Sequence, residues 1–196
     1  MKKKVIIICI LVVLVILLFP IKLQYKDGGT IEYKAILYKV IKWHRIDNNY
    51  DSGYYEGTEI HLFPTNFHDL GYYVSPKPSK LELSHDYQTI KASTGGYVWC
   101  NSYKRCETVE VLMVGEIDAY PTLEVPKNDN INYFYSPGII KYITVYKDSF
   151  ENKYDFKPII TDETISTPNE NGLYLYQVHV FNDNNSVDYY FALNVK

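Results

Sequence analysis

Hydrophobic and polar residues alternate along most of this chain. In VDYYFALNV, residues 187–195, apolar side chains occupy every second position: Val187, Tyr189, Phe191, Leu193 and Val195. A period of two places one set of side chains in a core and the other in solvent, as in a half-buried antiparallel strand. LYLYQVHVF, residues 173–181, precedes this segment across the polar loop NDNNS. The two segments are therefore predicted to form a β-hairpin.

Short segments of the same kind recur from residue 83 onward, separated by glycine, proline and polar turns. GGYVWC, residues 95–100, and IIKYITVYK, residues 139–147, are two of them. About seven short strands at this spacing, without a convincing helix, predict an all-β domain with the shape of an immunoglobulin-like β-sandwich. We place this sandwich at residues 83–196 and infer no strand order.

The region from 24 to 73 carries a less regular pattern. TIEYKAILYKVIKWHRI, residues 30–46, alternates at first and then changes phase, and it also fits a helical stripe. Its Ile, Val and Tyr content favours one long strand with a bulge near residues 37–39. A polar loop, residues 47–57, and a short strand, residues 58–64, complete a predicted hairpin region. VSPKPSK begins a connector at residues 74–82.

The chain begins with MKKK and an apolar run from Val5 to Leu23 that only Lys22 interrupts. A bilayer core of about 30 Å needs roughly 20 apolar residues in a helix. We therefore expect residues 5–23 to form a transmembrane signal anchor, with the Lys22 ammonium reaching the interface.

The alternatives to an uncleaved anchor have less support. A cleaved signal peptide ends in small residues, whereas this run ends in LLFPIKLQYKD, so we keep cleavage as the second interpretation. Cys9 follows three isoleucines and lacks a lipoprotein signal. By the positive-inside rule, Lys2, Lys3 and Lys4 make residues 1–4 a cytoplasmic tail and place the chain from about residue 24 outside the cell.

Cys100 and Cys106 flank the loop NSYKR, a spacing that suits facing strands of a hairpin. Outside the cell such thiols oxidise, so a structural disulfide is the favoured interpretation, with two free thiols as the alternative. A metal site needs further ligands, and no second cysteine pair or paired-histidine segment occurs. We expect neither a metal nor a cofactor.

Charge and aromatic content limit the classes of binding partner that we expect for this chain. Residues 24–196 carry a net charge of about −7, which argues against a nucleic-acid partner. Tyrosine is abundant, at 21 of 196 residues, which β-propensity alone explains well. A tyrosine also combines an apolar ring with a polar tip, so a tyrosine-rich patch is a candidate surface for an envelope glycan or another membrane or surface protein. That patch comprises Tyr50, Tyr54, Tyr55, Tyr72 and Tyr73.

Two stretches resemble known proteins. YKDGGTIEYKAILYKVIKWHRI, residues 25–46, resembles a recurring head of small membrane-anchored or lipoprotein-like proteins of Bacillota, and GTEIHLFPTNF is similar to the next segment of some of those proteins. ASTGGYVWC and GLYLYQVHVF resemble an extracytoplasmic immunoglobulin-like β-domain of the same kind of protein. This chain departs from them by lacking a lipobox and by adding Cys100 and Cys106. The resemblance implies a location and a fold, and it carries over no activity or catalytic residue.

No stretch identifies a reaction. None of the five histidines forms a known ligand pair, and the motifs G-x-S-x-G, S-x-x-K and the P-loop do not occur. His179, on the strand phase opposite Val178 and Val180, is expected to be exposed or at a rim. We therefore expect a membrane-anchored extracytoplasmic binding or sensing module and not an enzyme. A cell-envelope hydrolase that uses unidentified carboxylates is the alternative.

Overall fold

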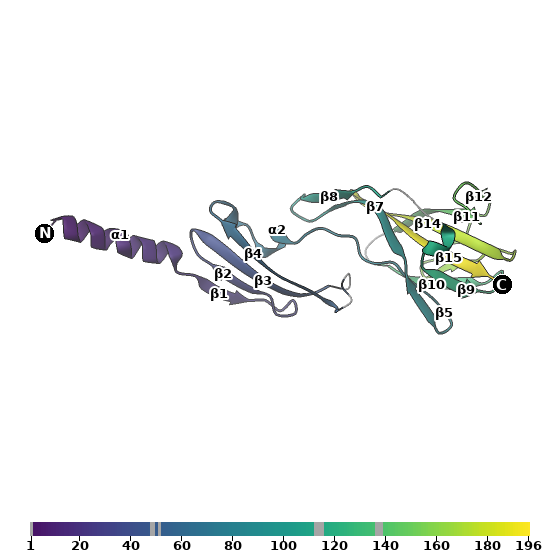
Figure 1. Ribbon diagram of the computed structural model, residues 1–196, viewed down its shortest axis with the longest axis horizontal. Helices are drawn as coiled ribbons and strands as arrows, with labels where there is room; N and C mark the ends of the chain where they lie inside the picture. Colours follow the sequence, from purple (N-terminus) through teal and green to yellow (C-terminus); the bar gives the residue numbers. More distant parts are fainter. Residues whose placement is uncertain (1, 48–49, 51, 112–115, 136–138) are drawn as a thin grey trace. The chain divides into compact units, whose positions relative to one another are not determined.

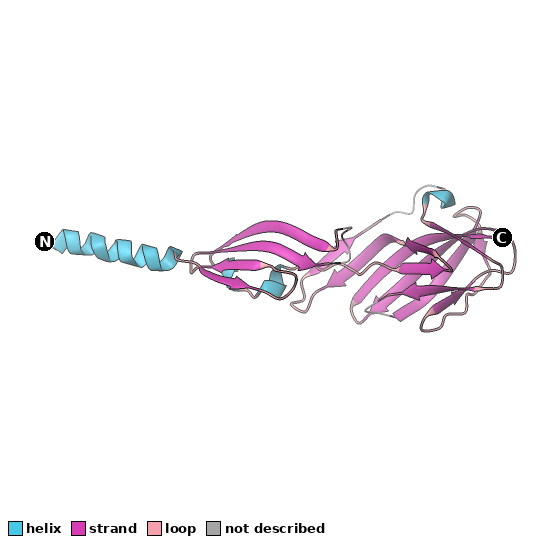
Figure 2. Ribbon diagram, turned by 90° about the horizontal axis from the view of Figure 1, so that it is seen from below, coloured by secondary structure: helices cyan, strands magenta, loops and turns pink. Residues whose placement is uncertain are grey.

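The structure, a computed structural model, describes residues 2–47, 50, 52–111, 116–135 and 139–196 (Figure 1). Strands paired almost entirely antiparallel form most of its regular structure, so the all-β prediction is confirmed (Figure 2). The chain divides into two compact units, which we call unit 1 (Met1–Tyr73) and unit 2 (Val74–Lys196).

Unit 1 begins with helix α1 (Lys2–Leu18). The prediction that this helix extends to residue 23 is wrong, because strand β1 occupies Ile21–Gln24. Pro20 explains the difference: it lacks an amide donor, and its ring disfavours the helical conformation of Phe19 before it. Within the described residues, we find no helix with both the length and the apolar character that crossing a bilayer requires.

After α1, unit 1 forms a four-stranded sheet in the order β1-β2-β3-β4. It contains β2 (Ile31–Lys34), β3 (Tyr38–Ile46) and β4 (Tyr54–Leu62). The single long strand predicted for residues 30–46 is therefore wrong. The chain reverses at residues 35–37, and the Ala35 amide donates to the Tyr38 carbonyl at 2.8 Å. This reversal, not a bulge, causes the change of phase in the sequence.

The loop predicted for residues 47–57 is also too long, because its last four residues belong to β4; residues 48, 49 and 51 lie outside the described part. One face of the unit 1 sheet is covered by the segment containing the 3-10 turn η1 (Thr65–Phe67) and the short helix α2 (Leu70–Tyr73). Ile41, Trp43 and Tyr73 are buried in this unit.

Unit 2 contains two sheets. The small sheet, in the order β13-β10-β5-β6, consists of β5 (Glu82–His85), β6 (Gln88–Lys91), β10 (Asn130–Phe134) and β13 (Thr164–Ser166). The large sheet has the order β12-β11-β14-β15-β7-β8, and β9 pairs parallel with β15. Its strands are β7 (Ser93–Cys100), β8 (Cys106–Val109), β9 (Thr122–Val125), β11 (Ile139–Lys147), β12 (Lys153–Tyr154), β14 (Gly172–Asn182) and β15 (Asn185–Val195).

One apolar core includes residues of both sheets. Leu83, Ile131 and Ile165 of the small sheet belong to the same buried cluster as the inward side chains of β14 and β15. Three tyrosines are fully buried in this core: Tyr174, Tyr176 and Tyr189. The hydroxyls of Tyr174 and Tyr176 donate to the carbonyls of Glu170 and Ser166, and that of Tyr189 donates to Ser79. Burial raises the pKa of Tyr176 and Tyr189 well above the usual value of a phenol.

Candidate binding surface

Three of the predicted patch residues gather at one end of unit 1. Tyr55 lies 5.8 Å from the ring of Trp43 and 5.4 Å from the ring of Tyr50. Tyr54, the neighbouring residue on β4, lies 4.6 Å from the ring of His44. Because adjacent residues of a strand point to opposite faces, Tyr54 lies on the open face of the sheet and Tyr55 on the covered face.

The other two predicted residues lie elsewhere in unit 1. Tyr73 is buried, stacks 3.9 Å from the ring of His61 and donates its hydroxyl to the Thr65 carbonyl. Tyr72 stacks 3.7 Å from His68. Tyr73 therefore helps to hold the covering segment on the sheet, and the five tyrosines do not form one surface.

A buried ion pair lies under the same covering segment. The ammonium of Lys39 lies 2.6 Å from a carboxylate oxygen of Glu32, and both side chains are almost fully buried. Lys39 also donates to the His68 carbonyl at 2.6 Å, and Tyr25 donates its hydroxyl to Glu32. Burial alone would raise the pKa of Glu32, but the hydrogen bonds from Lys39 and Tyr25 lower it below its usual value. Burial and the bond to Glu32 raise the pKa of Tyr25 to about 12.

This cluster joins the sheet of unit 1 to its covering segment. Every polar partner of the pair comes from unit 1 itself, and the pair connects β2 and β3 to the segment that covers them. Sequence reasoning missed it because Glu32 and Lys39 have the residue types of an exposed face.

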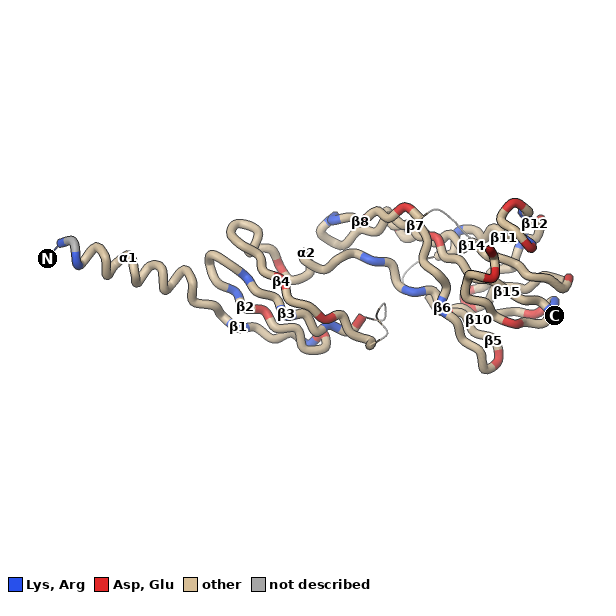
Figure 3. The backbone as a smooth tube through the Cα atoms, in the orientation of Figure 1, with Lys and Arg blue, Asp and Glu red and all other residues tan. Residues whose placement is uncertain are grey.

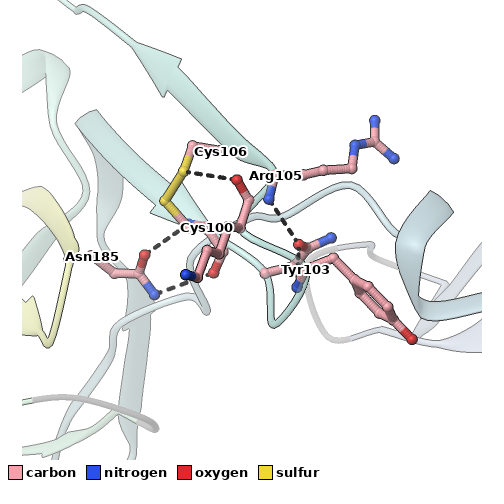
Figure 4. Close-up of a disulfide and its surroundings, with 7 residues drawn as sticks. Cys100, Tyr103, Arg105, Cys106 and Asn185 are labelled. Atoms are coloured by element: carbon pink, nitrogen blue, oxygen red, sulfur yellow. Dashed lines mark hydrogen bonds between the residues drawn. A yellow bond between two sulfur atoms is a disulfide. The ribbon is translucent and has the colours of Figure 1, made fainter.

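In unit 2, Cys100 and Cys106 form a disulfide between facing positions of β7 and β8 (Figure 4). The side-chain oxygen of Asn101 accepts from the amides of Tyr103 and Arg105, at 3.0 and 3.1 Å, and so holds the loop between the cysteines. On the other side, the Cys100 amide donates to Asn185 at 2.7 Å. The disulfide thus joins β7 to β8, and the Asn185 hydrogen bond connects this hairpin to the start of β15.

The strongest candidate surface lies on the outer face of the large sheet. We call it the His179 patch and define it as Tyr142, Gln177, His179, Phe181 and Asp188. These residues come from β11, β14 and β15, on the face opposite the inward side chains of the core. Tyr142 and Phe181 are exposed, and the other three are half-buried.

Polar contacts fix the arrangement of the His179 patch. His179 Nδ1 lies 2.6 Å from an Asp188 carboxylate oxygen, and the Tyr142 ring stacks on the imidazole with a centroid distance of 4.8 Å. Gln177 donates to the second oxygen of Asp188 at 3.2 Å. A carboxylate so placed holds the imidazole ring in one orientation. These contacts thus preorganise one ring, an imidazole, an amide and a carboxylate, and Phe181 adds a second exposed ring on the same face.

The neighbouring part of the same face is covered. Ile117 of the 3-10 turn η2 (Ile117–Ala119), with Tyr120 and Phe150, packs against Leu175, Tyr190 and Ala192. The His179 patch therefore lies on a part of this face that the η2 segment does not cover. The sequence predicts an exposed or rim position for His179 but not its partner Asp188, because the residues next to His179 in the sequence do not indicate it.

Each described carboxyl group with a shifted pKa accepts hydrogen bonds from neighbouring groups. The pKa shifts of described carboxyl groups are all downward, at Asp27, Glu32, Glu107, Asp129 and Glu170. At Glu107 the main cause is a hydrogen bond from Tyr97. Within the same residues no group of three His, Cys, Asp or Glu side chains is placed to hold a metal ion.

Comparisons of the chain with protein-family models, with curated proteins and with solved structures give no match. The resemblance to Bacillota envelope proteins therefore stays a prediction, and a function can be inferred only from the geometry of the two units.

Proposed function

We propose that this chain is a membrane-attached binding module that displays two β units on the outer side of a membrane and binds an envelope glycan through the His179 patch. The binding role rests on one observation, the patch itself: exposed rings lie beside an oriented imidazole and carboxylate, next to a part of the same sheet face that is covered.

The attachment rests on α1. Its large apolar side chains point outward all around the helix and are exposed, which is unfavourable in water and favourable in lipid. Lysines precede the apolar run and support an orientation with the N-terminus in the cytoplasm. The Cys100–Cys106 disulfide supports an oxidising location for unit 2.

We also infer that unit 2 is an immunoglobulin-like sandwich. Its second half pairs β10 with β13 in one sheet and places β11, β14 and β15 side by side in the other. That division corresponds to the two sheets of an immunoglobulin domain. Because unrelated functions occur on this architecture, the binding role must be argued from the patch and not from the fold.

The chemistry of the patch favours a glycan that is neutral or carries amino groups. An aromatic ring offers an apolar face to the C–H face of a sugar, while amide and carboxylate groups bond its hydroxyls. The net negative charge of residues 24–196 disfavours polyanionic polymers. The alternative of a hydrolase has less support, since a general acid needs a raised carboxyl pKa and the pKa shifts of Glu32, Glu107 and Glu170 are downward.

Retention on purified, insoluble envelope glycan tests this function. The intact protein in detergent is expected to sediment with the glycan, and Tyr142→Ala is expected to weaken retention. Tyr87→Ala is the matched control, because Tyr87 is fully exposed at the turn between β5 and β6 and lies outside the patch. Equal retention of both variants, with unchanged melting, would remove the His179 patch from the binding role.

A further inference from the structure

Two turns form the end of the unit 1 sheet next to α1. One joins β2 to β3 at residues 35–37, and the other follows β4 at residues 63–67. The Leu37 amide, in the turn between β2 and β3, donates to the Leu17 carbonyl at 3.3 Å. The Tyr38 hydroxyl donates to the Leu18 carbonyl at 3.2 Å. Phe63, which comes directly after β4, donates its amide to the Leu37 carbonyl at 2.9 Å. The last turn of α1 and both turns of the sheet therefore adjoin one another.

This end of unit 1 is apolar on its surface. Six large side chains from these segments are between 44 % and 71 % exposed. We call them the apolar rim: Phe19, Ile21, Ile36, Leu62, Phe63 and Phe67. The turns at residues 35–37 and 63–67 contain no charged residue and are drawn wholly in tan in Figure 3.

The opposite end of the same sheet is polar. Asp27 accepts from the amides of Gly29 and Thr30 in the turn before β2, and Arg45 pairs with Asp47 at 2.8 Å after β3. The polarity of unit 1 thus changes along its strands, from apolar beside α1 to charged at the far end.

The length of α1 indicates which part of a bilayer the apolar rim would contact. At 1.5 Å per residue its 17 residues rise about 25 Å, a few ångströms less than the roughly 30 Å of a bilayer core. The rim continues the apolar surface directly from the last turn of the helix. Lys22 and Lys34, on paired strands beside Ile21, place ammonium groups where lipid headgroups would lie.

We propose that the apolar rim of unit 1 is immersed in the boundary between headgroups and acyl chains of the bilayer that receives α1. The inference rests on the proposed membrane attachment and adds the surface by which the folded unit contacts lipid. Lipid is the occupant because the rim is continuous with a helix that is apolar on every side. A second copy of the chain, docked rim to rim, is the competing occupant that the experiment must distinguish.

Fluorescent labelling tests the rim in the full chain, reconstituted in phosphatidylcholine–phosphatidylglycerol vesicles. A polarity-sensitive probe is attached to Leu62→Cys in a Cys9→Ala background, and quenching by lipids with a nitroxide near the headgroup is measured. Thr58→Cys is the matched control, because Thr58 is exposed on the same strand and face and lies four residues toward the charged end. Both positions are exposed, so both variants are expected to fold.

The expected result is a blue shift and strong quenching at position 62, with little of either at position 58. Vesicle flotation separates two failures. A chain that does not float with vesicles overturns the proposed attachment and, with it, the rim. A chain that floats, but whose two labels are quenched equally little, overturns the rim alone. A blue shift at position 62 that grows with protein concentration and resists the nitroxide overturns the lipid contact in favour of a second copy.

Discussion

Glu32 and Lys39 lie on neighbouring strands of unit 1 with their charged atoms 2.6 Å apart, and both side chains are almost fully buried. A buried ion pair adds little stability over an apolar pair of the same shape, but removing one partner leaves an uncompensated buried charge. Replacing one partner of this pair therefore tests how much unit 1 depends on it for stability.

Glu32→Gln is expected to destabilise unit 1 by about 3–5 kcal/mol, because Lys39 stays buried without its counter-charge. Denaturant unfolding followed by the fluorescence of Trp43, in a Trp99→Phe background, measures the loss. The double variant Glu32→Leu/Lys39→Met should recover most of it. A single variant as stable as the parent would contradict the buried-pair account.

Lowering the pH should reduce the unfolding free energy of unit 1, because it protonates the Glu32 carboxylate. The folded-state pKa of Glu32 is lowered below its ordinary value of 4.5, so its stabilisation is complete above about pH 4.5 and is lost as pH falls through the folded pKa. A pH series of the Trp43 unfolding signal should show this decline in the parent. In Glu32→Gln the acid-dependent part should be smaller, and parallel curves would exclude Glu32 as its source.

Gly95→Ala should destabilise unit 2. An added Cβ would lie 2.3 Å from Cε2 of the buried Tyr190 ring and 3.1 Å from the Asp188 carbonyl oxygen. Overpacking of this kind costs about 1–3 kcal/mol. Gly57→Ala is the control, because its nearest neighbour would be 3.7 Å away at the Tyr55 hydroxyl. Thermal melting that is lowered equally by both variants would contradict the prediction.

Opening the Cys100–Cys106 disulfide should cost unit 2 about 2–2.5 kcal/mol, since the closed loop is short. The paired variant Cys100→Ser/Cys106→Ser, compared with the parent by denaturant unfolding of Trp99 fluorescence, measures it. Asn185→Ala tests the connection to β15 separately, because it removes the acceptor of the Cys100 amide without touching the disulfide. We expect Asn185→Ala to lower the unfolding free energy of unit 2 also when the disulfide has been reduced.

The two adjacent tyrosines of β4 should respond differently to truncation. Tyr55→Ala removes a ring that packs near Trp43 and Arg45, so it should lower the unfolding free energy of unit 1. Tyr54→Ala, on the open face, should leave that free energy nearly unchanged. Equal losses would show that the two faces of the sheet are equally packed, contrary to the structure.

The register of one hairpin explains why the His179 patch could not be predicted from the sequence. Alternation identified β14 and β15, but the polar run NDNNS suggested a five-residue loop. In the structure Asn182 faces Asn185, which places Asp188 opposite His179. Because the pattern has a period of two, an error of one residue in register exchanges the faces and hides this pair.

In unit 1 the sequence pattern indicates strands but not where the chain reverses. The turn at residues 35–37 contains neither glycine nor proline, and its formation depends on pairing between β2 and β3. The burial of Glu32 and Lys39 is likewise a tertiary effect: the covering segment, residues 64–73, determines which face is closed. Local propensity contains no information about either feature.

The strand order of the large sheet sets the sequence in which unit 2 can fold. β14 and β15 pair from Asn182–Asn185 to Gly172–Val195, contacts close in the chain, whereas β15 meets β7 through residues as distant as Ser186 and Val98. Closing long loops costs more entropy than closing a hairpin, so we expect the β14–β15 hairpin to form before β7 pairs with β15. Before β7 pairs, residues 186–190 of β15 form an unprotected edge that is open to pairing with another chain. A holding chaperone that shields that edge would therefore raise the yield of folded protein.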